Sequence, residues 1–142
     1  MKAMRAYGQT RQVNSESRDV VIHFEEGLIG FSECKDFVLK EADYLAPFRL
    51  LQSLESPARA FLVLEPTKLV MNYCDLVPAR AWESLGVSGK VKPRAFVIVV
   101  IGSTPEFSTG NFQAPLLIND EKMIGKQVIL TDSGFSVRQR LL

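Results

Sequence analysis

The sequence predicts an all-β fold, mainly antiparallel, as a compact β-barrel-like or sandwich domain with one short helix. Apolar and β-branched residues occur in runs too short for helices, and turn-forming residues separate these runs. One segment, residues 78–86, instead repeats apolar residues at helical spacing. The chain has 142 residues, of which 46% are hydrophobic and 23% charged, enough for a single domain over residues 1–142.

The expected strands follow one another along the chain with turns between them. Residues 20–24 run into Glu25, Glu26 and Gly27, which is typical of a strand that feeds a glycine turn. The run at residues 94–101 is apolar on both faces, which predicts a central strand covered on both sides. Further strands are expected at residues 37–39, 48–51, 61–64, 112–118, 127–130 and 135–137.

The expected helix covers residues 78–86. Ala81, Trp82 and Leu85 follow Pro78 at intervals of three, four and seven, so all four share one helical face. Proline near the start and Gly86 just past the end are the usual boundary residues of a helix. This segment is therefore predicted as a short amphipathic helix.

Charge is unevenly distributed although the formal net charge is +1. Residues 1–18 carry 4 basic and 1 acidic side chains, residues 19–45 carry 2 and 7, and residues 46–142 carry 11 and 8. The middle stretch is either an ordinary solvated face or a docking patch for a basic partner. The near-neutral total gives no support for a nucleic-acid-coating surface. The acidic residues are Asp19, Glu25, Glu26, Glu33, Asp36, Glu41 and Asp43.

No motif indicates catalysis or cofactor binding. His23, the single histidine, lies in a predicted strand away from any nucleophile motif and is interpreted as structural. Cys34 and Cys74 are far apart and have no metal-ligand spacing, which is typical of two reduced thiols. Phosphate-binding glycine loops are missing from the sequence. We therefore expect no enzymatic activity, no metal or other cofactor and no small-molecule substrate.

The longest apolar run, residues 95–101, is much shorter than the roughly 20 residues of a membrane-spanning helix. The amino-terminal residues are not followed by the apolar segment of a secretory signal. The sequence therefore predicts a cytoplasmic protein that does not interact with a membrane.

Residues 24–31, Phe-Glu-Glu-Gly-Leu-Ile-Gly-Phe, resemble the F-x-E-G-[LI]-x-G-F signature of the bacterial flagellar assembly factor FliW family. Later blocks follow in the family's order. Residues 50–53 are similar to its W-L-Q-S segment, and residues 61–66 to its F-x-V-x-[DN]-P segment. Residues 111–119 resemble N-L-x-A-P-[IL]-x-[IV]-N, and with residues 127–130 the resemblance extends over about residues 18–138.

The resemblance implies a small β-barrel-like protein without enzymatic activity that binds two protein partners. One is flagellin, held before export. The other is CsrA, a small basic RNA-binding translational regulator that the family antagonises, so that flagellin translation is coupled to filament assembly. Direct contact with nucleic acid is not implied. The alternative is a small-ligand-binding β-barrel or an enzyme subunit, which a deep apolar pocket with a few convergent polar groups would distinguish.

Candidate partner-binding residues come from the blocks at residues 24–31 and 111–119 and from the acidic residues that follow the first block. The acidic side chains are the candidates for a basic partner, whereas Phe31 is either a core residue or a contact aromatic. Asn111 and Pro115 either shape a strand end or line an interface. Gly27 and Gly30 are interpreted as turn residues. The candidate set is Glu25, Glu26, Phe31, Glu33, Asp36, Asn111 and Pro115.

Overall fold

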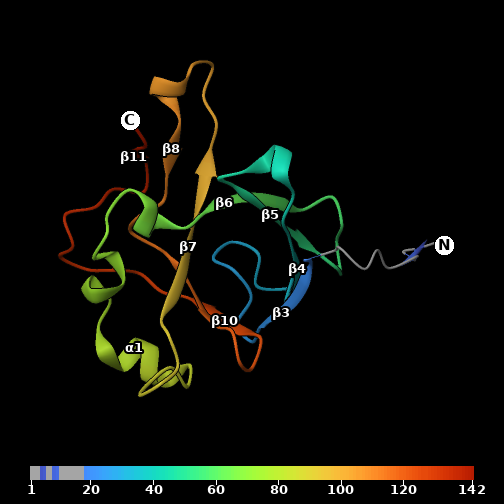
Figure 1. Ribbon diagram of the computed structural model, residues 1–142, viewed down its shortest axis with the longest axis horizontal. Helices are drawn as coiled ribbons and strands as arrows, with labels where there is room; N and C mark the ends of the chain where they lie inside the picture. The colour runs from blue at the N-terminus through green and yellow to red at the C-terminus, as the bar shows by residue number, and fades with distance from the viewer. Residues whose placement is uncertain (1–3, 6–7, 10–17) are drawn as a thin grey trace.

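The computed structural model describes residues 4–5, 8–9 and 18–142. Seven strands pair in a ring and form a closed barrel, whose arrangement Figure 1 shows. Neighbouring strands are antiparallel except β3 and β10, which are parallel, and β7 closes the ring by pairing with both β6 and β9. The β-barrel expectation is thereby confirmed. Around the ring the strands are β7 (Arg94–Val100), β6 (Ala60–Leu64), β5 (Arg49–Ser53), β4 (Asp36–Lys40), β3 (Val20–Phe24), β10 (Ile124–Gln127) and β9 (Leu116–Asn119).

Two short strands extend the sheet beyond the ring. β8 (Thr109–Gly110) pairs with the end of β7, and β11 (Gln139–Arg140) pairs with β8. A 3-10 turn, η4 (Pro105–Phe107), lies in the connection between β7 and β8, which projects above the barrel in Figure 1. A separate parallel pair joins β1 (Met4–Arg5) to β2 (Gly8–Gln9). Most of the basic stretch at residues 1–18 lies outside the described residues.

Alternate residues of each strand face the interior of the barrel and fill it with apolar side chains. The loop after β3 adds two more apolar residues, Leu28 and Cys34, which close one end of the barrel. Phe24 meets Phe37 edge to face, with ring centroids 5.6 Å apart. We call this set the inner cluster: Ile22, Phe24, Leu28, Cys34, Phe37, Leu39, Leu51, Val63, Phe96, Leu116 and Ile118.

A second apolar cluster lies against the outer face of β7. The chain between β6 and β7 forms η2 (Pro66–Lys68), η3 (Tyr73–Leu76) and α1 (Ala79–Ser84), and Figure 1 shows this segment beside β7, away from the ring. α1 lies within the predicted helix, and β7 is covered on both faces as predicted. The outer cluster contains Leu64, Tyr73, Val77, Trp82, Leu85, Val87, Ala95, Val97, Val99, Phe112, Leu117 and Leu130.

The short 3-10 helix η1 (Asp43–Leu45) connects β4 to β5. Within the described part of the chain, no helix is both long enough and apolar enough to cross a membrane.

Three expected strands differ from the structure. The run expected at 112–118 is a strand only from Leu116, because Asn111–Ala114 forms a turn and Pro115 has no N–H to donate. The strand expected at 127–130 lies earlier, at β10. Residues 128–130 follow β10 without regular strand structure. The Val128 amide donates to the Pro115 carbonyl at 3.1 Å, and the Leu130 amide donates to the Gln113 carbonyl at 2.7 Å.

The strand expected at residues 135–137 is absent, and β11 follows it instead. Phe135 packs its ring against Tyr73 and Phe112, with centroids 5.4 and 5.7 Å away. This segment therefore packs an apolar side chain into the outer cluster although its backbone is irregular. Sequence periodicity alone does not distinguish such a segment from a strand.

Asn119 is a buried polar residue that joins α1 to the β9–β10 hairpin. Its side-chain amide donates to the Leu85 carbonyl at 2.9 Å, and its side-chain oxygen accepts from the amides of Glu121 and Lys122 at 3.0 and 3.1 Å. Asn119 is 1% exposed and its bond to the Leu85 carbonyl is buried, so removal of the side chain leaves that carbonyl without a partner.

We expect Asn119→Ala to lower the free energy of unfolding by about 2–4 kcal/mol, because one carbonyl and two amides lose their partner. Urea denaturation measures this loss. Asn72→Ala is the matched control, since Asn72 is exposed and makes no capping hydrogen bond with its side chain. Equal losses in the two variants would contradict the role assigned to Asn119.

Candidate functional site

The turn after β3 carries Glu25 and Glu26 on the surface. Gly27 has a φ of +67°, and a Cβ at this position would lie 2.6 Å from the Ser32 Cα. Glycine is therefore required here for both its backbone conformation and its missing side chain. Leu28, next in the chain, is buried in the inner cluster and anchors the turn. The glycine-turn prediction is confirmed.

His23 lies at the base of this turn between two carboxylates. Its Nδ1 is 2.8 Å from Asp36 Oδ1, and its Nε2 is 3.1 Å from Glu25 Oε1. The hydrogen bond to Asp36, followed by that to Glu25, raises the pKa of His23 above its ordinary value. His23 thus links the end of β3 to the start of β4 and to the turn.

The other acidic residues of the segment at residues 19–45 are partly neutralised within the fold. Glu33 lies 3.7 Å from Arg59, and Glu41 and Asp43 both pair with Arg18. Glu26 forms no ion pair with any residue that the structure describes. The acidic segment therefore presents less free negative charge than its composition suggests, and Glu25, Glu26 and Glu33 are its exposed candidates.

Phe31 combines core and surface character. Its ring packs on Phe61 with centroids 5.3 Å apart, while the Arg59 guanidinium lies 4.7 Å from the Phe31 centroid. One side of the ring thus covers the inner cluster, and the residue remains half-buried. Phe31 is therefore positioned both to stabilise the loop and to touch a partner.

Asn111 and Pro115 shape the segment before β9. The Asn111 side-chain oxygen accepts from the Ala114 amide at 3.1 Å, and the Asn111 amide donates to the Ile98 carbonyl at 2.8 Å. Pro115 is buried, so its side chain is not displayed to a partner. Both residues hold a loop in place in this structure.

Gln127, which sequence reasoning did not single out, joins the two predicted motifs. Its Oε1 accepts from the Ile29 amide at 2.8 Å, and its Nε2 donates to the Ala114 carbonyl at 3.0 Å. The β3 turn and the 111–115 loop are therefore neighbours, although about 85 residues separate them in the sequence. The sequence offered one signal for this role, because Gln127 is a polar residue at the start of the otherwise apolar run at residues 127–130.

A network of alternating charges lies at the opposite end of the barrel from the β3 turn. Each of its members lies two residues along the chain from an apolar residue of the inner cluster, and it therefore faces the same side of the sheet, because alternate residues share a face. Along β7, for example, Arg94 is two residues before Phe96. We call this the charged mouth: Glu41, Arg49, Glu65, Arg94 and Asp120.

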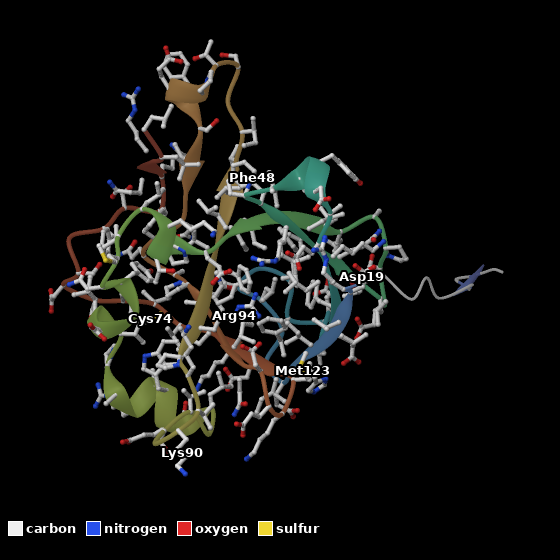
Figure 2. The ribbon with its side chains drawn as sticks, in the orientation of Figure 1. Asp19, Phe48, Cys74, Lys90, Arg94 and Met123 are labelled. Atoms are coloured by element: carbon white, nitrogen blue, oxygen red, sulfur yellow. The ribbon has the colours of Figure 1, made fainter. Side chains whose placement is uncertain are left out.

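The charged mouth closes the barrel with paired rather than free charges. Arg49 reaches Glu65 at 2.9 Å and Glu41 at 3.5 Å, and Arg94 reaches Asp120 at 3.1 Å and Glu65 at 3.7 Å. Both guanidinium groups also lie over the Phe96 ring, 5.5 and 4.9 Å from its centroid. Figure 2 labels Arg94 beside the lower part of β7.

An apolar groove lies at the other end of β7, where the β7–β8 connection meets residues 141–142. It has a volume of about 470 Å³ and opens beside Phe48, which Figure 2 labels near the top of the ring. Ile101 and Leu142 line it and remain exposed, as does the nearby Phe107. Apolar side chains gathered at one exposed place are typical of a protein-binding surface.

The site offers little to a metal or cofactor. No group of three or more His, Cys, Asp or Glu side chains in the described ranges is arranged to hold a metal ion. The interior of the barrel is filled by the inner cluster rather than open to a ligand. The closed seven-stranded barrel, its exposed turn and its apolar groove together define a small β-barrel protein with surfaces suited to protein partners.

Comparison with known proteins identifies the family. The family model described as "FliW protein" matches residues 6–141. The flagellar assembly factor FliW of Leptospira interrogans (strain 56601) is 37% identical over 123 residues, covering 86% of this chain and 82% of that protein. That of Geobacillus sp. (strain WCH70) is 35% identical over 129 residues, covering 91% and 88%.

A solved structure described as "Crystal structure of the flagellar assembly factor FliW" has the same fold, with a TM-score of 0.77 at 33% sequence identity. The match covers 92% of this chain and 89% of that one. The chain belongs to the FliW family of flagellar assembly factors.

We expect Gln127→Leu to increase the hydrogen-exchange rate of the Ile29 amide, because the substitution removes its hydrogen-bond acceptor while keeping a side chain of similar size. Exchange followed by NMR measures the rate. Gln113→Leu is the control, since the Gln113 side chain makes no hydrogen bond to the turn. An unchanged Ile29 rate in Gln127→Leu would refute the bridge.

Proposed function

We propose that this protein is a non-catalytic, cytoplasmic flagellar assembly factor that binds flagellin and antagonises CsrA. The strongest support is its membership of the FliW family, whose curated relatives are named flagellar assembly factors. The fold adds surfaces of two kinds, an apolar groove at the β7–β8 connection and an acidic turn after β3. We assign one partner to each surface.

The apolar groove is proposed as the flagellin-binding surface. A filament subunit held before assembly exposes the apolar faces that it later buries in the filament, so a protein that holds it needs an apolar surface. Ile101, Phe107 and Leu142 supply exposed apolar side chains around the groove, and Phe48 also lines it. The neighbouring basic side chain Arg140 is engaged, because its Nε donates to the Glu106 carbonyl at 3.1 Å.

The acidic turn is proposed as the docking surface for CsrA, which is basic. Glu25, Glu26 and Glu33 are exposed, and Gly27 sets the backbone conformation of the turn that carries the first two. Opposite charges on two partners accelerate their encounter and fix their orientation. Asp36 belongs to the same segment but is half-buried on His23, so it contributes to the turn rather than directly to the contact.

We expect reversal of Glu25, Glu26 and Glu33 to lysine to slow association with CsrA and to flatten its salt dependence. Salt screens such charges over a Debye length of about 8 Å at physiological ionic strength. Thermal stability should change little, since exposed charges contribute about 0–1 kcal/mol each. Surface plasmon resonance at low and high salt measures the association rates.

The matched control reverses Asp75, Glu83 and Glu106, three exposed acidic residues outside the turn, and changes the net charge equally. A docking role requires that this control keep most of the association rate. If the association rate is unchanged in the turn variant, or if both variants slow association equally, the acidic segment is an ordinary solvated face and not a docking surface.

We expect the double variant Ile101→Asp, Leu142→Asp to weaken flagellin binding at least tenfold, since it places two charges in an apolar contact. CsrA association should remain close to that of the unmodified protein. Isothermal titration calorimetry with purified flagellin measures the affinity.

Ile129→Asp is the control for this variant, because Ile129 is also an exposed isoleucine but lies outside the groove. If Ile129→Asp weakened flagellin binding as much as the double variant, the groove would not be the flagellin site.

A further inference from the structure

His23 is the single histidine of the chain, and a carboxylate faces each of its ring nitrogens. The contact to Asp36 is 2.8 Å and that to Glu25 is 3.1 Å. An ionised carboxylate only accepts hydrogen bonds, and a neutral imidazole has a single N–H to donate. The observed geometry is therefore satisfied on both sides only when His23 is the doubly protonated imidazolium.

The two carboxylates differ in how many contacts hold them and in how exposed they are. Asp36 is the cross-strand partner of His23 in the β3–β4 ladder, and its amide donates to the Glu55 carboxylate at 3.2 Å. Glu25 lies in the turn, and its side chain is 87% exposed compared with 45% for Asp36. Of the two contacts, the one to Glu25 is therefore expected to break when His23 loses its second proton.

Other charged groups surround His23 from each neighbouring element. On the β4 side, the Lys35 ammonium donates to the Glu25 carbonyl at 2.6 Å. On the β10 side, Lys126 shares with His23, Glu25 and Glu26 the lining of a groove of about 330 Å³, which Ser84 and Leu85 at the end of α1 complete. The hydrogen bonds to Asp36 and Glu25 have the largest effects on the pKa of His23, and desolvation opposes them.

We propose that His23 is a pH-dependent latch that ties the Glu25–Gly27 turn to β4 when protonated and releases the Glu25 carboxylate when neutral. Hydrogen bonding to Asp36 and then Glu25 raises the pKa of His23 above its ordinary value, which favours the latched form. The latch therefore stabilises the fold fully below the ordinary histidine pKa of 6.5 and is lost as the pH rises through the raised folded value.

The latch regulates the acidic docking surface, and this consequence rests on the proposed function. In the latched form, Glu25 is engaged by a positive charge. In the released form, Glu25 is free beside Glu26, and the turn is one unit more negative. Association with a basic partner is thus expected to accelerate as the pH rises through the His23 midpoint.

NMR titration of the whole protein tests the latch without any partner. Because the chain has one histidine, its ring signals need no assignment among several. We expect a midpoint above 6.5, with the amide signals of Glu25, Glu26 and Gly27 changing at that same midpoint. A midpoint at or below 6.5, or turn amides that do not respond there, would overturn the proposal.

Two variants separate the latch from general electrostatics. Glu25→Gln should lower the proton affinity of His23 about two- to fivefold and remove the response of the turn amides. Glu26→Gln is the matched control, because it removes an equal charge from the adjacent residue that does not contact the ring. If Glu26→Gln lowered the midpoint as much as Glu25→Gln, the direct contact would not be the cause.

A further experiment measures the rate of association with CsrA below and above the midpoint of the His23 titration. It compares the unmodified protein with Glu25→Gln. Faster association above the midpoint only in the unmodified protein supports regulation by the latch, and a rate independent of pH contradicts it. If CsrA fails to bind at every pH, the proposed function fails, while the NMR titration still decides whether the latch exists.

Discussion

The barrel depends on β7 (Arg94–Val100), which pairs with two different neighbours along its length. Its first half, through Phe96, pairs with β9, and its second half, from Val97, pairs with β6. This division closes the ring and removes the exposed sheet edges that an open sheet of these strands would leave. Both faces of the strand are also buried, one in the barrel and one under the η2–η3–α1 layer, so β7 is the element through which the two apolar clusters are coupled.

Much of this architecture was predictable, because short apolar runs bounded by turn residues identify strands directly. β3, β7 and α1 lie at or within a residue or two of the predicted positions. The errors fall in the last third of the chain. There Pro115 delays β9, and Phe135 contributes its ring to the outer cluster from an irregular segment. An apolar residue indicates that its side chain is buried, but it does not indicate whether its backbone pairs with a neighbouring strand.

The candidate site was less predictable, because its contacts join residues that are remote in the sequence. The β3 turn was identified from its glycines, and the resemblance named the family. The Gln127 bridge and the charged mouth, by contrast, depend on the closed ring, which alone brings Arg49, Glu65 and Arg94 together. Composition suggested one free acidic patch. The fold instead engages Asp36 and Glu25 with a histidine and Glu33 with an arginine.

The parallel pairing of β3 with β10 is the shortest junction in the ring, with His23 opposite Ile124 and Phe24 opposite Gly125. A hundred residues separate its two strands in the sequence, so this junction joins segments that only the closed ring brings together. Gly125 permits it, because a Cβ there would lie 2.5 Å from the Phe24 ring. The packing of Gly125 against Phe24 therefore helps to set the position of the neighbouring His23, and through it the contacts that His23 makes with Asp36 and Glu25.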